Sequence, residues 1–264
     1  MPPRSIEIAG ATVRIFDDAA AACNAAADSI ASTIRAAIES QGRAVIGLAT
    51  GHTPMAVYAR LVALHRRGGV SFENVSTFNL DEYYPISPTD PQSYRVYMDR
   101  HLFNHVSIRP NHTHLFDGTI PEAFVADHAA EFDRWIVAEG GLDLQLLGIG
   151  RNGHIGFNEP SDLPTDRALK LPSRLMHLHP ITLEDAALDF GDVSLVPRRA
   201  LTLGVTPILA ARSILVLAFG PKKAEIVAKA LRGPITAEVP ASLLRSAQGR
   251  VTWLIDEAAA VSLG

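Results

Sequence analysis

Short apolar runs alternate along the chain with longer stretches whose apolar residues recur at helical spacing. The runs that predict buried strands are 44–49, 75–80, 142–147, 213–219 and 251–255. The stretches that predict helices are 18–40, 54–67, 91–105, 121–139 and 220–232. Strands that alternate with helices of this length predict an α/β fold whose mainly parallel sheet is covered by helices on both faces.

Two further stretches complete this expectation. Residues 6–8 and 13–15 alternate like a short opening hairpin. Residues 161–196 have poor periodicity and prolines at 164, 172 and 180, with another at 197, which predicts an irregular excursion or mobile lid. Since no Pro/Gly/Ser-rich linker or internal repeat interrupts the chain, we expect a single domain over residues 1–264 with a lid at about 161–196.

Composition narrows the classes of partner. The formal net charge of the 264 residues is -4, and the absence of a long Lys/Arg run argues against a nucleic-acid surface. No apolar run reaches the roughly 18 residues that span a bilayer, so no membrane partner is expected. The one cysteine, Cys23, cannot form an internal disulfide and fits a reducing cytoplasm. We therefore expect a cytoplasmic protein with a small-molecule partner, and homo-oligomerisation is left open.

Three loops with polar chemistry follow predicted strands. They are residues 50–54, 79–84 and 148–160. In a doubly wound sheet the ligand lies beyond the carboxyl ends of the strands, at the point where the strand order reverses. The three loops therefore predict one site at that edge.

The third loop, Gly-Ile-Gly-Arg-Asn-Gly-His-Ile-Gly-Phe-Asn-Glu-Pro, sets His154 five residues before Glu159. An imidazole with an acid that orients it suits proton transfer near neutral pH. Asn152 offers a neutral amide for a substrate oxygen, and Arg151 is interpreted as a surface charge. A solvated surface turn is the alternative for an isolated His-Gly pair.

The first two loops offer an anion site and a base. Thr50, Gly51 and Thr53 stand at a helix start, where N–H groups and hydroxyls can hold an anion, and Lys223 can add positive charge. Asp81 and Glu82 point to opposite sides of an extended strand, so only one of them is expected to act as a general base. Taken singly, each of these groups could also be a helix cap or a solvated charge.

The sequence gives little support to a zinc site or to a serine hydrolase. His101 and His105 are four residues apart, but no glutamate follows the first as in zinc proteases, so no metal is expected. The Gly-x-Ser-x-Gly elbow of serine hydrolases is absent.

Four motifs in order resemble the glucosamine-6-phosphate deaminases. They are Leu48 to Pro54, Phe78 to Tyr83, Pro91 to Tyr94 and Gly150 to Pro160, and the similarity resumes at 196–205 and 220–224. The resemblance implies a Rossmann-like fold and conversion of glucosamine 6-phosphate to fructose 6-phosphate and ammonia, without metal or organic cofactor.

The resemblance also implies roles for single residues. Asp81 would move the proton from C2 to C1, and His154, oriented by Glu159, would open the sugar ring. The catalytic set is completed by Asn152. The substrate-binding and phosphate-binding set is Thr50, Gly51, His52, Thr53, Glu82, Gly153 and Lys223. His52 replaces the glycine or serine that is usual in this loop.

Two departures from the family pattern bear on binding. An arginine that grips the phosphate normally precedes a pair of aromatics in the middle segment, but residues 185–190 contain none, and Arg167 and Arg174 are the candidates to replace it. The basic pair that binds an allosteric activator in regulated members is replaced by Met176 and Leu178, so we expect no such activation.

Three alternatives stay open at this point. The related 6-phosphogluconolactonases typically have Thr-Ala-Ser-Leu after the histidine, where this chain has Ile155-Gly156-Phe157-Asn158. A deaminase for another amino-sugar phosphate, such as galactosamine 6-phosphate, would keep the chemistry and change the sugar. A sugar-phosphate sensor without turnover is the third, and the joint presence of Asp81, His154 and Glu159 argues against it.

Overall fold

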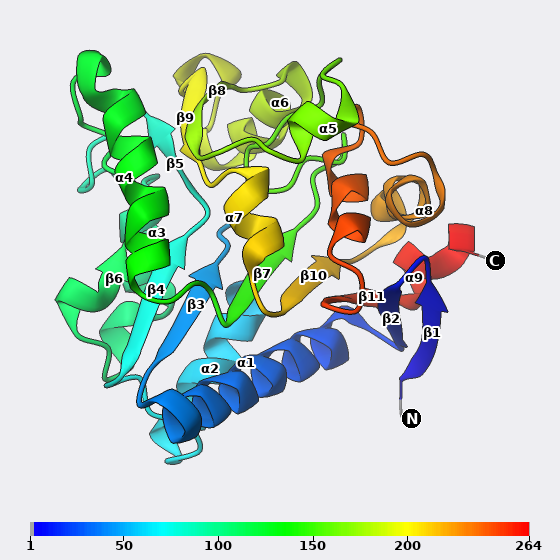
Figure 1. The fold of residues 1–264 in the computed structure, drawn as a ribbon, viewed down its shortest axis with the longest axis horizontal. Helices are drawn as coiled ribbons and strands as arrows, with labels where there is room; N and C mark the ends of the chain where they lie inside the picture. Colours follow the sequence, from blue (N-terminus) through cyan, green and yellow to red (C-terminus); the bar gives the residue numbers. More distant parts are fainter. Residues whose placement is uncertain (1–2, 264) are drawn as a thin grey trace.

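The computed structural model describes residues 3–263 and contains one large and one small sheet (Figure 1). The strands of the large sheet, in spatial order, are β1 (Arg4–Ile8), β2 (Ala11–Phe16), β11 (Val251–Asp256), β10 (Ile214–Ala218), β7 (Leu144–Gly148), β3 (Ala44–Leu48), β4 (Val75–Asn79) and β6 (Thr113–His114). All neighbours pair in parallel except β1, which forms an antiparallel hairpin with β2. The predicted α/β fold with a mainly parallel sheet is confirmed.

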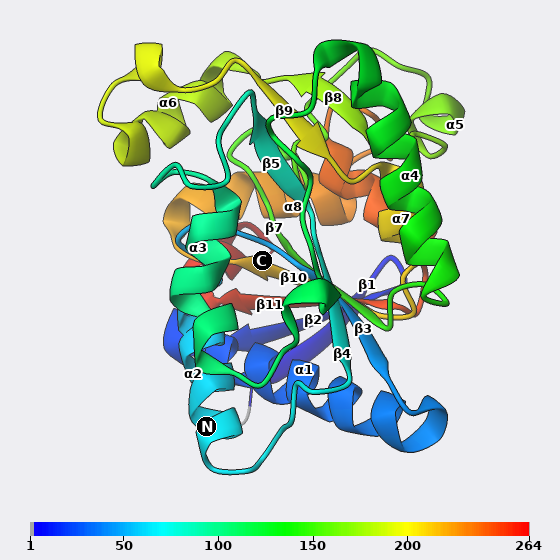
Figure 2. The ribbon, with the colours of Figure 1, turned by 90° about the vertical axis from the view of Figure 1, so that its left-hand side faces the viewer.

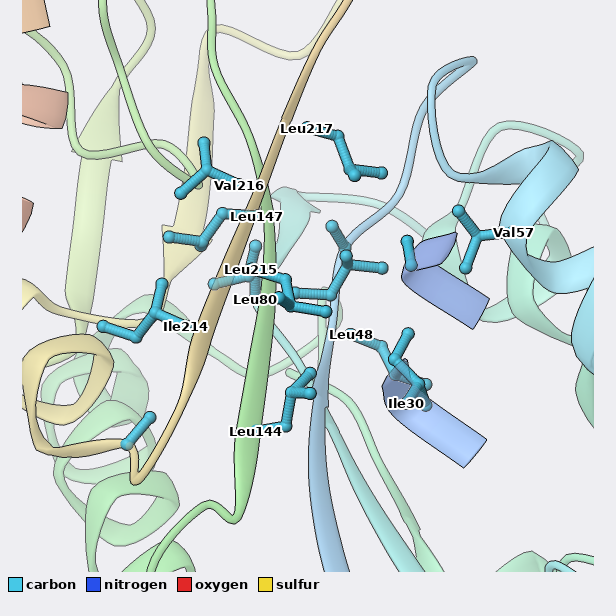
Figure 3. Close-up of a cluster of buried hydrophobic side chains, with 14 of the residues drawn as sticks. Ile30, Leu48, Val57, Leu80, Leu144, Leu147, Ile214, Leu215, Val216 and Leu217 are labelled. Atoms are coloured by element: carbon cyan, nitrogen blue, oxygen red, sulfur yellow. The ribbon is translucent and has the colours of Figure 1, made fainter. Parts of the chain in front are cut away.

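The helices cover both faces of this sheet. The helices of the described residues are α1 (Ala19–Gln41), α2 (Met55–Arg66), α3 (Tyr94–His101), α4 (Val125–Ala138), α5 (Thr165–Ala168), α6 (Pro180–Phe190), α7 (Val205–Ala210), α8 (Ala224–Arg232) and α9 (Glu257–Ala260), of which α5 and α6 lie near the small sheet described below (Figure 1). Leu48 of β3 lies on the same side as Ile30 of α1 and Val57 of α2 (Figure 3). On the opposite face, the Phe78 ring packs edge-on against Phe132 of α4, with ring centroids 5.5 Å apart. Figure 2 shows α2 and α4 on opposite sides of the sheet.

Short 3-10 helices connect these elements. They are η1 (Phe103–His105), η2 (Pro110–His112), η3 (Glu122–Phe124), η4 (Val193–Leu195), η5 (Pro221–Lys223), η6 (Pro240–Ser246) and η7 (Val261–Leu263). The predicted helix 91–105 is therefore shorter than expected. Its regular part begins at Tyr94 because the hydroxyl of Ser93 accepts the N–H of Val96 and caps it. Within residues 3–263, no helix is both long and apolar enough to cross a membrane.

Capping residues determine where the long helix α1 begins and ends. Asp18 accepts the N–H of Ala21 at 2.7 Å and caps the start. Gly42, at φ 77°, ends the helix in the left-handed conformation that glycine adopts without strain. Alanines fill much of the buried face, so the helix can lie close to the sheet.

The small sheet was not predicted from the sequence. It consists of β5 (Asp81–Tyr84), β9 (Arg199–Thr202) and β8 (Arg174–His177), paired antiparallel in that order. Only Leu80 separates β4 from β5, and its carbonyl accepts the N–H of Leu203 at 2.6 Å. The chain thus passes directly from the large sheet into a second one above the carboxyl ends of the parallel strands (Figures 1 and 2).

The expectation of an irregular excursion at 161–196 is wrong. This segment contains α5, β8, α6 and η4. Pro164 immediately precedes α5 and Pro180 opens the first turn of α6, where a missing N–H breaks no helical hydrogen bond. These two prolines therefore mark helix starts. Mobility of this segment and the single-domain organisation stay predictions.

The topology fixes where a ligand can bind. From β3 the chain proceeds to β4 and β6 on one side, and then crosses to β7, β10 and β11 on the other. The strand order therefore reverses between β3 and β7. The loops after these two strands meet there, as expected for a ligand site in an open α/β sheet.

Candidate active site

A cavity of about 230 Å³ opens at this reversal point, between the strand ends, the small sheet and α6. Ligand pockets measure roughly 300–1,000 Å³, so this cavity suits a small ligand. Its lining residues are Ala49, Thr50, Gly51, His52, Thr53, Pro54, Leu80, Asp81, Tyr83, Tyr94, Gly148, Ile149, Gly150, His154, Gly156, Phe157, Thr182, Asp185, Ala186, Asp189 and Lys223. The three loops predicted from the sequence therefore do converge on one cavity.

Asp81 lies at the first position of β5 with its side chain in this cavity. It is almost fully buried, and burial, together with the charge of Glu82, raises its pKa well above the usual range. The His154 loop passes close by at Gly156, where a β-carbon would stand 3.0 Å from Thr202 Oγ1 and 3.5 Å from Asp81 Oδ2. Glycine at this position, with φ 56°, lets the two loops approach.

Glu82 points the other way and does not line the cavity. Its carboxylate accepts the backbone N–H groups of Tyr83, Tyr94 and Arg95. Burial raises the pKa of Glu82 to about 7, although these hydrogen bonds oppose the shift. The side chain of Glu82, which was predicted to bind substrate, therefore contacts the backbone at the start of α3.

His154 and Glu159 lie together as the spacing suggested. Nδ1 of His154 is 3.5 Å from Oε2 of Glu159 and 3.3 Å from Oγ1 of Thr182. Burial alone would raise the pKa of Glu159, but hydrogen bonds and the charge interaction with His154 lower it to about 2. With Nδ1 engaged, Nε2 is the ring nitrogen left for a substrate.

Asn152 and Gly153 support this pair from behind and do not line the cavity. The Asn152 amide donates to Glu159 Oε2 at 2.8 Å, and its Oδ1 accepts the N–H of His154 at 3.2 Å. Gly153 has φ 89°, and a β-carbon there would stand 3.0 Å from Ile226. These contacts favour positioning of the loop over contact with substrate.

The loop of residues 50–53 forms one end of the cavity at the start of α2. N–H groups at a helix start lack intrahelical acceptors and favour an anion. The Tyr97 hydroxyl donates to the Gly51 carbonyl at 2.6 Å, where glycine has φ 98°. Lys223 reaches the cavity while donating to the Ile149 carbonyl at 2.7 Å, and burial lowers its pKa.

Sequence reasoning missed the contribution of α6. Its residues Thr182, Asp185, Ala186 and Asp189 line the cavity, as do Tyr83 and Tyr94. Arg174, a candidate phosphate clamp, instead donates to Asn158 Oδ1 at 2.9 Å, and neither it nor Arg167 lines the cavity. The only sequence signal for α6 was Pro180 followed ten residues later by Phe190 and Gly191, a plausible helix start and stop.

The histidines considered as metal ligands in the sequence have other contacts in the structure. Among residues 3–263, no group of three or more His, Cys, Asp or Glu side chains is arranged to hold a metal ion. His101 packs its ring against Tyr97 at 4.6 Å, and His105 Nε2 lies 2.8 Å from the Arg100 carbonyl.

Comparison with known sequences gives a consistent result. A family model described as glucosamine-6-phosphate isomerases/6-phosphogluconolactonase matches residues 17–253. A glucosamine-6-phosphate deaminase of Geobacillus sp. is 42% identical over 227 residues, which are 86% of this chain and 87% of that protein. Glucosamine-6-phosphate deaminase 2 of Bacillus subtilis is 41% identical over 235 residues, or 88% of this chain and 91% of its own.

Comparison of the fold with solved structures agrees with the comparison of sequences. A solved structure described as a monomeric glucosamine-6-phosphate deaminase superposes with a TM-score of 0.88 at 37% identity, covering 95% of this chain and 99% of the other. The 6-phosphogluconolactonase of Trypanosoma brucei gives a TM-score of 0.74 at 21% identity, covering 96% and 98%. The second likeness concerns the fold alone.

Proposed function

The chain belongs to the glucosamine-6-phosphate isomerase/6-phosphogluconolactonase family, and from this premise we propose that it converts glucosamine 6-phosphate to fructose 6-phosphate and ammonia. The observation that carries the proposal is the meeting of Asp81 and His154 in one cavity that is also lined by residues 50–53, at a helix start suited to an anion. The deaminases of Geobacillus and Bacillus subtilis, each about two-fifths identical over most of the chain, support the choice of reaction.

The phosphate is proposed to bind at the start of α2. Backbone N–H groups and the hydroxyls of Thr50 and Thr53 would hold its oxygens, and Lys223 would supply charge. This anchor would orient the sugar so that C1 and C2 face Asp81 and His154.

Ring opening is assigned to His154. Its Nε2 would take the proton from the C1 hydroxyl and deliver it to the ring oxygen, which breaks the C1–O5 bond and leaves C1 as an aldehyde. Glu159 and Thr182 hold the other ring nitrogen, so the imidazole keeps one orientation during the transfer.

Deamination follows from acid–base chemistry at Asp81. The aldehyde acidifies the C2 proton, Asp81 removes it, and the ammonium group of the substrate passes a proton to the aldehyde oxygen. Asp81 then returns its proton to C1 of the enolamine that forms. The resulting imine at C2 takes up one water molecule and releases ammonia, which leaves the ketone of fructose 6-phosphate. The raised pKa of Asp81 makes it a stronger base than an exposed aspartate, and the ammonium group of the substrate would favour its ionised form.

The test is a coupled assay of the purified protein with glucosamine 6-phosphate. We expect ammonia and fructose 6-phosphate in equal amounts. Galactosamine 6-phosphate and 6-phosphogluconolactone serve as parallel substrates, because turnover of either in preference would identify one of the two catalytic alternatives. Binding of glucosamine 6-phosphate without any product would favour the sensor and contradict the proposal.

Three expectations from the sequence accompany this proposal. They are turnover without organic cofactor, a cytoplasmic location and no activation by an amino-sugar phosphate effector. Sigmoidal kinetics that such an effector abolishes would contradict the last, since Met176 and Leu178 offer no positive charge.

A further inference from the structure

Helix α6 lines the cavity and contributes two carboxylates to its wall. Asp185 and Asp189 are four residues apart on one helical face, and both line the cavity. This is unexpected for a site that takes a doubly charged phosphate, because like charges repel at short range. Each carboxylate, however, already has a basic partner.

Asp189 is paired with the anion-binding loop. Its Oδ1 lies 3.0 Å from Nε2 of His52, and its backbone carbonyl accepts the Gln92 side chain at 2.6 Å. The carboxylate therefore contacts a side chain of the loop at the start of α2, where the phosphate is proposed to bind.

Asp185 is paired with Arg151. The Arg151 Nε lies 2.7 Å from Asp185 Oδ1, and its Nη2 lies 3.3 Å from Glu184 Oε2. Lys223 belongs to the same cluster. Burial lowers the pKa of Lys223 most, while the charge of Asp185 raises it and that of Arg151 lowers it further. Asp185 thus pairs directly with Arg151, and its charge also raises the pKa of Lys223, whose ammonium group donates to the Ile149 carbonyl.

We propose that, in the free protein, Asp185 and Asp189 hold the cations that bind the phosphate. When a phosphate enters, it displaces the two carboxylates and is bound by Arg151 together with Lys223 and His52. This rests on the proposed function for the identity of the ligand. A phosphate monoester carries about -1.5 to -2 charge at neutral pH and forms bidentate contacts with a guanidinium, so it outcompetes a singly charged carboxylate. Arg151, outside the cavity lining while it pairs with Asp185, becomes available when that carboxylate withdraws.

The inference predicts that removing a carboxylate and removing Arg151 change the affinity for phosphate in opposite directions. Asp185→Asn and Asp189→Asn remove the internal competitor, so the KM for glucosamine 6-phosphate and the Kd for inorganic phosphate should each fall about threefold to tenfold. Arg151→Ala should raise both by about tenfold. Asp162→Asn, an exposed change of the same charge in the same segment, should leave both unchanged.

Calorimetric titration of inorganic phosphate separates this inference from the proposed function, because it needs no turnover. Ammonia release with unchanged phosphate affinity in the Asn variants would overturn the inference alone. Tighter phosphate binding in a protein that releases no ammonia would leave the inference standing and remove the proposed function. Weaker binding in both Asn variants, or no phosphate binding in any variant, would also overturn it.

Discussion

The loops at the strand ends and helix α6 form opposite walls of the same cavity, but they acquire their positions by different means. The loops place Asp81 and His154 where two strands end, and close approach of the backbone at Gly156 fixes their relation. Helix α6, from a segment between β7 and β9, is held by apolar packing of Leu183 and Ala186 with Tyr83 and Phe157, and its carboxylates pair with His52 and Arg151. The first wall is set by backbone geometry, and the second presents exchangeable ion pairs on a helix that apolar packing holds in place.

This difference suggests a division of labour. Asp81 and His154 on the loops should act on bonds of the substrate, and changes to them should lower kcat. Groups on α6 should set access and affinity, and changes there should mainly alter KM. Thr182 is the exception that joins the two walls, because it contacts His154 from α6.

The largest expected effect lies in the loop wall. Asp81→Asn should lower kcat by about 10²- to 10⁴-fold, the usual contribution of a general base, with little change in phosphate affinity. Proton exchange between C2 of the substrate and deuterated solvent should stop. Exchange at the normal rate in this variant would place the base elsewhere and break the proposed contrast between the walls.

The neighbouring carboxylate should affect stability and leave the chemistry in place. The pKa of Glu82 is about 7 in the folded protein against an ordinary 4.5, because burial disfavours its charge. Such a group adds stability below pH 4.5 that is lost as pH rises through 7, at most about 3 kcal/mol. Urea unfolding should show this decline for the native protein and a flatter profile for Glu82→Gln. Parallel profiles would contradict the assignment.

A third change separates loop geometry from loop chemistry. In Gly150→Ala the new β-carbon would stand 2.2 Å from the His154 ring, so the imidazole must move. We expect kcat to fall about 10- to 100-fold with thermal stability nearly unchanged. Gly148→Ala is the matched control, since its β-carbon would meet nothing within 4 Å, and it should lose much less activity. Equal loss in both variants would show that the position of His154 is not what matters.

The smallest effect tests the residue that joins the two walls. Thr182→Val removes a hydroxyl that contacts His154 and Glu159, and one hydrogen bond of this kind contributes about 1 kcal/mol. We expect kcat to fall about fivefold and KM to stay constant. A change in KM alone would assign Thr182 to binding with the rest of α6.

What could be predicted from sequence follows the same division. The parallel strands, and the approach of Asp81 to His154, follow from apolar runs and from loops that must meet at one sheet edge. The turn of Glu82 away from the cavity was half foreseen, because strand alternation separates it from Asp81, but its partners at the start of α3 depend on tertiary structure.

The contribution of α6 could not be foreseen in the same way. Prolines in its first turn and just before α5 resembled loop signals, although both positions tolerate proline. The pairs of Arg151 with Asp185 and of His52 with Asp189 join residues 34 and 137 positions apart, and no local pattern records such distances. Arg151 was therefore interpreted as a surface charge.

The most direct test of the central claim is a crystal structure with an unreactive open-chain amino-hexitol 6-phosphate. The account predicts the phosphate at the loop of residues 50–53 beside Lys223, with C1 and C2 within reach of the Asp81 carboxylate and O5 near Nε2 of His154. A ligand that contacts only one of these two side chains, or that lies with its phosphate at the Asp81 end, would contradict it.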